Sequence, residues 1–351
     1  MYTQKYRPRK LKQLVGQPGA VSLLAGIVNN EKRPQTYLVY GPYGCGKTTI
    51  SRILAKRLNC SDPVGADSCN KCPSCTRFRD GNHPDLVEIN AASSRGIDDA
   101  RTLAEQASYA PRYKKRVILL DEAHMLTPQA FKSLLKPLEE PAPNTIFMLI
   151  TSEDTKIPKE IRSRCSDIVL KKVPTTVLAD KLLRVICKVE KVSLPDDILM
   201  KVAELSDGRP RNAISNLERV VMSMGCSGSP DLESITKVLE EITASSPVAA
   251  AEKYLLLCKR GSKDAFSAFD DVPQLDEFVS ICARLLVDAW KNTRPAKFIK
   301  AFARMDAATL GMATATMRVA VDKLGYDSTE YTKDVVMAEV TFNLIDLFEQ
   351  A

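Results

Sequence analysis

The sequence predicts an α/β fold, a parallel sheet with helices on both faces, followed by a long all-helical region. Short apolar runs rich in β-branched residues alternate with segments of helical periodicity as far as Lys171, and only helical patterns follow. The 351 residues are 44% hydrophobic and 26% charged, which is typical of a globular protein with two or three domains.

Five apolar runs are predicted to form strands, at residues 37–40, 86–89, 117–120, 146–150 and 168–170. Helices are predicted between most of them, at 48–58, 98–109 and 128–138. Further helices are predicted at 175–190, 196–206, 211–224, 232–241, 276–291, 295–305 and 331–349, and 243–247 is expected to be a linker. We therefore expect an α/β domain at 1–172, a small helical domain at 173–243 and an all-α domain at 244–351.

Composition narrows the class of protein. The formal net charge of +7 favours a polyanionic partner such as DNA, but only weakly, because many soluble proteins are mildly basic. The chain has no run of 18 apolar residues, and no apolar stretch follows the basic segment 1–12, so we expect neither a membrane span nor a secretory signal. Four of the ten cysteines cluster at ligand-like spacing, which favours a reducing, cytoplasmic setting with one metal site over a disulfide framework.

Residues 41–48 match the phosphate-loop motif G-x-x-x-x-G-K-[ST] at every fixed position, between an apolar strand and a helical pattern. Glycines let backbone N–H groups surround phosphate oxygens, and the helix N-terminus adds partial positive charge. Lys47 is expected to reach the β- and γ-phosphates of ATP, and the Thr48 hydroxyl to bind Mg²⁺. The predicted ATP contacts in this segment are Gly41, Gly44, Cys45, Gly46, Lys47, Thr48 and Thr49.

The apolar strand at 117–120 ends in two carboxylates, Asp121 and Glu122, which are followed by Ala123 and His124. In phosphate-loop proteins such a strand ends beside the phosphate loop, where Asp121 would hold Mg²⁺ directly or through water. Glu122 would polarise the water that attacks the γ-phosphate. We interpret His124 as structural.

The four clustered cysteines, Cys60, Cys69, Cys72 and Cys75, follow the pattern C-x8-C-x2-C-x2-C. Thiolates two residues apart can hold one tetrahedral Zn²⁺ from a tight turn, and four ligands leave no open position, so the predicted module at 60–75 is structural. An iron–sulfur cluster, four unligated thiols, or His83 as a spare ligand are the alternatives.

Together these motifs resemble a known family. The order of phosphate loop, cysteine module, Asp-Glu-Ala-His and Ser163-Arg164-Cys165 is similar to that of the gamma/tau subunits of the bacterial DNA polymerase III clamp loader, which are AAA+ ATPases. The resemblance runs from about Lys5 to Asn212 and includes residues 6–8, 15–17 and 134–141. The cysteine module inside an AAA+ domain is its most discriminating part.

The resemblance implies roles for further residues. Ser152, with Thr151 beside it, ends the fourth strand where the family has a sensor 1 residue for the γ-phosphate or the catalytic water. Arg164 would be the arginine finger that completes the ATP site of the neighbouring subunit. Arg211 fits sensor 2, an arginine that faces the phosphates from a helical lid at 173–243, with Arg209 as the alternative. The residues expected to pack around adenine are Arg7, Pro8 and Val15.

The resemblance also implies partners. Such a subunit would join other clamp-loader subunits in a pentameric ring with several copies of itself, held together by a collar at 244–351, and would bind a sliding clamp and primer–template DNA. Arg95 and Arg101 lie where the family lines the DNA channel, although Gly96 departs from the basic residue often seen there. The helix containing Leu126 and Phe131 resembles the clamp-contacting region, but its apolar residues fit a core equally well.

Two other functions stay open. One is a different AAA+ DNA-remodelling ATPase, a branch-migration motor or a helicase loader, against which the cysteine module and the Ser-Arg-Cys triplet argue. The other is a non-hydrolysing structural subunit of the same loader, against which the intact Lys47 and Asp121 argue. Because the sequence stops at Ala351, without the long extension of tau-type subunits, we expect a short, gamma-like subunit. Its source would be a bacterium, or a phage acting in the bacterial host cytoplasm.

Overall fold

The structure, a computed structural model, describes residues 1–30, 32–224, 232–244, 247–262, 264–265, 275–290, 302, 305, 307–326 and 330–349. Contacts along the chain divide it into two compact units, Met1–Ile235 and Thr236–Ala351. Each unit is described by itself.

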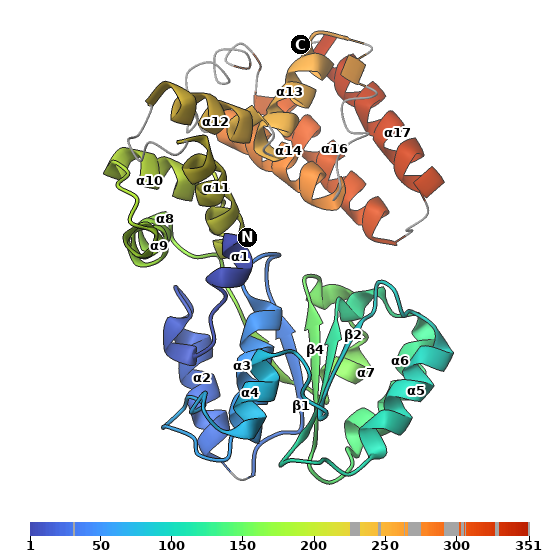
Figure 1. Cartoon of the computed structure of the whole chain (residues 1–351). Helices are drawn as coiled ribbons and strands as arrows, with labels where there is room; N and C mark the ends of the chain where they lie inside the picture. Colours follow the sequence, from blue (N-terminus) through green and yellow to red (C-terminus); the bar gives the residue numbers. More distant parts are fainter. Residues whose placement is uncertain are drawn as a thin grey trace. The chain divides into compact units, whose positions relative to one another are not determined.

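The first unit is built on a five-stranded parallel sheet with the strand order β2-β3-β4-β1-β5 (Figure 1). The central strand β4 has every residue buried, because both of its neighbours are strands and both faces of the sheet are covered. The strands are β1 (Thr36–Tyr40), β2 (Leu86–Asn90), β3 (Arg116–Asp121), β4 (Thr145–Thr151) and β5 (Ser166–Val169).

Helices cover the sheet on both faces, as Figure 1 shows. Alternate residues of each strand point to opposite faces, so Tyr37 and Val39 pack with one helical layer and Leu38 with the other. The helices of the first layer are α2 (Pro18–Asn29), α3 (Lys47–Asn59) and α4 (Pro73–Arg79). Those of the second are α5 (Ile97–Ser108), α6 (Pro128–Glu139) and the short α7 (Lys159–Arg162).

The rest of the first unit is helical. The helix predicted at 175–190 is present as α8 (Thr175–Leu178), a π-helical turn (Ala179–Leu183) and α9 (Arg184–Glu190), and it is followed by α10 (Asp196–Glu204) and α11 (Pro210–Ser223). The short N-terminal helix α1 (Tyr2–Lys5) lies against these helices: the Tyr2 backbone N–H donates to Glu218 at 2.9 Å, and the Lys5 ammonium pairs with Glu190 at 2.7 Å.

The described elements of the second unit are all helices. Its core contains the fully buried side chains of Tyr254, Phe278 and Leu344, and the Tyr254 hydroxyl lies 2.9 Å from that of Thr341. The helices are α12 (Leu232–Ala244), which contains the division point, α13 (Pro247–Lys259), α14 (Leu275–Trp290), α16 (Ala307–Tyr326) and α17 (Glu330–Glu349).

All five predicted strands are confirmed, with ends that differ by one or two residues. Helix α4 was not predicted, because Pro73 and its neighbours resemble turn residues, although proline is favoured in a first helical turn. Most of the helix predicted at 295–305, and residues 245–246 of the predicted linker, lie outside the described residues. Within the described part of the chain, no helix has both the length and the apolar content that crossing a bilayer requires.

Candidate active site

The candidate site lies at the edge of the sheet where the strands end. Tyr40 of β1 is paired with Thr151 of β4, and Asn90 of β2 with Asp121 of β3. Because all strands are parallel, their carboxyl ends meet at one edge, and the phosphate loop, which leaves β1, lies there as well.

The backbone of the phosphate loop depends on its glycines. Gly41 has φ +144°, and a Cβ there would lie 2.2 Å from the carbonyl oxygen of Leu170. Gly44 and Gly46 also have positive φ, and Gly46 caps the N-terminus of α3. The loop thus leaves the first N–H groups of α3 free to bind an anion.

Lys47 is 6% exposed, and its ammonium donates to the carbonyls of Gly41 at 2.8 Å and Pro42 at 3.2 Å. Burial lowers the pKa of this ammonium below its ordinary value, although the charges of Glu122 and Asp121 oppose the shift. Two neutral carbonyls compensate a buried charge only in part, so a phosphate would be a much stronger partner.

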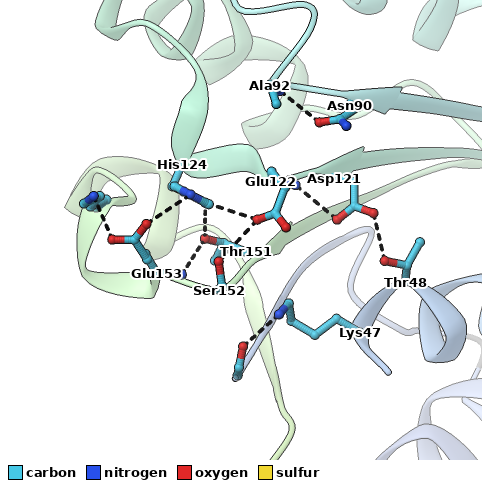
Figure 2. Close-up of polar contacts among 12 residues, drawn as sticks. Lys47, Thr48, Asn90, Ala92, Asp121, Glu122, His124, Thr151, Ser152 and Glu153 are labelled. Atoms are coloured by element: carbon cyan, nitrogen blue, oxygen red, sulfur yellow. Dashed lines mark hydrogen bonds and ion pairs between the residues drawn. The ribbon is translucent and has the colours of Figure 1, made fainter. Parts of the chain in front are cut away.

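Thr48 and Asp121 form the part of the site suited to Mg²⁺. The Thr48 hydroxyl donates to Asp121 Oδ2 at 2.8 Å, and the Glu122 backbone N–H donates to Asp121 Oδ1 at 3.1 Å (Figure 2). A hydroxyl and a carboxylate side by side are the hard oxygen ligands that Mg²⁺ prefers, so this pair fits the ion.

Glu122 follows Asp121 in the left-handed backbone region, with φ +51°, which is uncommon for a residue other than glycine and is typical of functional sites. Its Oε2 accepts a hydrogen bond from the Ser152 hydroxyl at 3.3 Å. Thr151 is fully buried, and its hydroxyl lies 2.9 Å from His124 Nδ1. Of the two predicted sensor residues, Ser152 is therefore the one in contact with Glu122.

Arg7 is a further cation beside the phosphate loop. Its Nε donates to the Thr49 hydroxyl at 3.1 Å, and burial, followed by the charge of Arg52, lowers the pKa of the Arg7 guanidinium.

The two sensor 2 candidates also lie beside the phosphate loop. Arg211 donates its backbone N–H to the Gly44 carbonyl at 3.3 Å and a guanidinium N–H to the Tyr43 hydroxyl at 3.0 Å. Arg209 is 9% exposed and acts electrostatically on Lys47, so both sensor 2 candidates lie by the loop. Pro8 and Val15 are half-buried.

Arg164 lies apart from these residues, one residue past the end cap of α7. Its guanidinium donates to the backbone carbonyl of Glu160 and lies 3.4 Å from the Glu139 carboxylate. The expected action of Arg164 on a neighbouring subunit stays a prediction.

The predicted DNA and clamp contacts also lie outside the site. Arg95 is exposed and donates to the Ala92 carbonyl at 2.9 Å, and Arg101 pairs with Asp98 at 3.4 Å. Leu126 and Phe131 are buried in the core under α5 and α6, at 7% and 5% exposure, which favours the core alternative for both.

The four cysteines converge between α3 and β2. Cys60 caps the C-terminus of α3 and Cys72 the N-terminus of α4, and the four Sγ atoms all lie within 4.8 Å of one another. Backbone N–H groups point at the sulfurs, from Cys69 to Cys60 at 3.2 Å and from Cys72 to Cys69 at 3.3 Å. Such bonds stabilise thiolates, and a closed set of four sulfurs fits a tetrahedral Zn²⁺.

The pKa shifts within the cysteine cluster differ: burial raises the pKa of Cys60 and Cys75, whereas backbone N–H groups lower that of Cys69. Burial alone raises the pKa of Cys72, but backbone N–H groups of Ser61 and Cys75 outweigh it and lower that pKa to about 6. Lys56, 7% exposed, adds a positive charge beside the sulfurs. His83 is not a ligand here, because its two ring nitrogens bond to the Ser74 hydroxyl and the Asp85 backbone N–H.

Two residues beside the candidate ATP site were not assigned a role from the sequence: His124, interpreted as structural, and Glu153, which was not singled out. His124 contacts Thr151 and Glu153 at the end of β4, and its Nδ1 lies 3.6 Å from Glu122 Oε2. The hydrogen bond from His124 lowers the pKa of Glu153 to about 2. Only the position of His124 two residues after Glu122 hinted at this, since the contact depends on which strands are neighbours.

The fold has known relatives. Thermotoga maritima RuvB, a Holliday junction branch migration motor, has the same fold with a TM-score of 0.55 and 17% identity, over 80% of this chain and 85% of RuvB. At that identity the likeness concerns the fold alone. The five-stranded parallel sheet, with a phosphate loop and the Asp121-Glu122 pair at its edge, defines an α/β protein of the phosphate-loop class.

Proteins that are similar in sequence identify the family more narrowly than the fold does. The family model for DNA polymerase III, delta subunit, matches residues 16–174. The gamma/tau subunit of Mycoplasma genitalium is 41% identical over 63% of this chain, and that of Mycobacterium bovis is 32% identical over 92%. The chain is therefore a homologue of the bacterial DNA polymerase III gamma/tau subunits. It spans 37% of the first relative's length and 58% of the second's.

Proposed function

We propose that the chain is an ATP-dependent clamp-loader subunit, which binds and hydrolyses ATP in order to open a sliding clamp and place it on primer–template DNA. The 2.8 Å contact between Thr48 and Asp121, in a homologue of gamma/tau subunits, is the observation that carries this proposal. It supports a complete Mg²⁺–ATP site, which a purely structural subunit does not need.

In the proposed reaction, Lys47 and the first N–H groups of α3 hold the β- and γ-phosphates of ATP. Thr48 and Asp121 would hold Mg²⁺, which neutralises charge developing on the phosphates. Glu122 orients and polarises the attacking water. Ser152, which contacts Glu122, senses the presence of the γ-phosphate. Arg7, Pro8 and Val15 pack around the adenine of the nucleotide. Arg211, or Arg209, faces the phosphates from the helices after β5.

Arg164 acts on the ATP of the neighbouring subunit, where its charge stabilises the transferred phosphoryl group.

We propose a division of the chain into an ATPase domain at 1–172, a lid at 173–243 and a collar at 244–351. The partners would be other clamp-loader subunits in a pentameric ring with several copies of this chain, a sliding clamp, and DNA contacted through Arg95 and Arg101. The bacterial relatives support the bacterial cytoplasm as the setting.

The four-cysteine module would hold one structural Zn²⁺ through Cys60, Cys69, Cys72 and Cys75. A segment of this size has little core of its own, so the ion would supply part of its folding energy. The convergence of the four Sγ atoms supports this role.

Steady-state ATP turnover tests the proposed function. It is measured for the full chain alone, with primed DNA, and with primed DNA plus a sliding clamp and bacterial partner subunits. Turnover that rises with DNA and again with the clamp, and that is lost in Lys47→Ala, is expected. Turnover that does not respond to the clamp but accompanies strand unwinding would instead support a DNA motor, as RuvB is.

A further inference from the structure

We propose that Tyr43 is a positioning residue for Arg211: it holds the guanidinium beside the phosphate loop before ATP binds, without neutralising its charge. Tyr43 occupies a variable position of the phosphate-loop motif, so the motif itself gives it no task. The inference rests on the proposed binding of ATP, and it adds a side chain that acts on the nucleotide only through Arg211.

Three contacts join Arg211, the second residue of α11, to the phosphate loop. The Arg211 backbone N–H donates to the Gly44 carbonyl at 3.3 Å. A guanidinium N–H donates to the Tyr43 hydroxyl at 3.0 Å, and the guanidinium carbon lies 5.6 Å from the centre of the Tyr43 ring. The backbone of Arg211 is therefore fixed by the loop, and Tyr43 fixes its side chain as well.

Tyr43 holds the guanidinium without cancelling its positive charge. A tyrosine hydroxyl and the face of its ring are neutral partners, and in the described part of the chain no carboxylate pairs with Arg211. Arg209, in contrast, pairs with Asp207 at 3.5 Å. The Tyr43 hydroxyl occupies one of the five guanidinium N–H groups, so the others are available to a phosphate, which is a stronger partner than a hydroxyl.

The contact matters because a long side chain loses rotamer freedom when it binds a ligand, and that loss weakens binding. Tyr43 is 40% exposed and Arg211 is exposed as well, so without a partner the Arg211 side chain would move among its rotamers. Tyr43 restricts this motion before the nucleotide arrives, which leaves less freedom to be lost with ATP. Removal of Tyr43 should therefore weaken ATP binding only when Arg211 is present.

A double-mutant cycle on ATP affinity tests the inference in the full chain. For Tyr43→Ala we expect the Kd for ATP to rise about two- to tenfold, the effect of leaving one long side chain to be ordered by the ligand. In an Arg211→Ala background, where Lys47 still supports measurable binding, the same substitution should change the Kd little. Tyr43→Phe keeps the ring face without the hydroxyl, so its Kd should lie between those of the wild type and Tyr43→Ala.

A second exposed tyrosine provides the matched control. The guanidinium carbon of Arg116 lies 6.0 Å from the centre of the Tyr109 ring, at the amino end of β3 and away from the phosphate loop. Tyr109→Ala should leave the Kd for ATP unchanged, and thermal midpoints check that every variant is folded.

Two results would overturn the inference. One is an unchanged Kd in Tyr43→Ala. The other is an equal loss of affinity with and without Arg211, which would mean that Tyr43 contacts the nucleotide or shapes the loop by itself. Absence of Lys47-dependent ATP binding in the wild type would instead overturn the proposed function.

Discussion

The Thr48 hydroxyl donates to Asp121 Oδ2 at 2.8 Å, across 73 positions of sequence. The contact joins the first turn of α3 to the last residue of β3. Two motifs recognised separately in the sequence therefore share one hydrogen bond, and the two oxygens lie next to each other where Mg²⁺ would bind.

Replacing Thr48 with valine removes this hydroxyl while keeping the branched shape. We expect the affinity for ATP in the presence of Mg²⁺ to fall about tenfold or more, because one hard oxygen ligand is lost. Affinity measured in EDTA should change much less. Thr48→Ser keeps the hydroxyl and serves as the control; equal losses with and without Mg²⁺ would contradict the role in metal binding.

Gly41→Ala tests the backbone of the phosphate loop. The added Cβ would lie 2.2 Å from the Leu170 carbonyl oxygen at φ +144°, so we expect a loss of about 2–4 kcal/mol in the free energy of unfolding. Gly46→Ala is the matched control, since its Cβ would meet no atom within 4 Å and only the strain of φ +100° remains. Urea unfolding curves compare the two, and a Gly41→Ala loss no larger than that of Gly46→Ala would refute the steric argument.

Cys72→Ser tests the metal site. We expect the purified chain to contain about one Zn²⁺ per molecule and the variant to contain much less, because one of four thiolate ligands is replaced by a weaker one. Elemental analysis of the protein and its thermal midpoint with and without a chelator give the result. Cys187→Ala, at a buried position in α9 far along the chain, should retain the ion. Iron in place of zinc would favour the iron–sulfur alternative.

Arg164 can be tested by mixing two inactive variants. In a complete loader, Lys47→Ala lacks an ATP site but keeps its arginine, whereas Arg164→Ala keeps its ATP site. If Arg164 acts on a neighbour, mixing the two should restore part of the turnover that each lacks alone. If it acted on its own chain, the mixture would be as inactive as its components.

Glu153 gives a pH dependence. Its folded pKa is about 2 against an ordinary 4.5, so its contacts with His124 and Lys156 stabilise the fold above pH 4.5, and this contribution is lost as the pH falls toward 2. The difference in unfolding free energy between wild type and Glu153→Gln should therefore be largest above pH 5 and shrink below it. Urea unfolding at several pH values measures this, and a difference that grew on acidification would contradict the assignment.

Local patterns were enough to predict the strands and the motif residues. The phosphate loop, Asp121 and the cysteines are defined by short spacings, which a sequence displays directly. Arg7 and Ser152 entered the predicted site only through the family resemblance. Their contacts with Thr49 and Glu122 were not predicted, because such contacts join distant segments. The contacts of His124 with Glu153 depend on β3 lying next to β4, and strand order cannot be derived from hydrophobic periodicity.

Helix α3 carries the phosphate loop at its first residue and a cysteine of the four-thiol cluster at its end cap, 13 helical residues apart. That separation corresponds to about 20 Å along the axis of one continuous helix. Cobalt, which absorbs visible light when four thiolates hold it, would therefore be an optical label built into the chain, bound at the end of α3 remote from the nucleotide. If nucleotide binding strained α3 as far as its end cap, the absorption spectrum of the bound cobalt would change, with no dye attached.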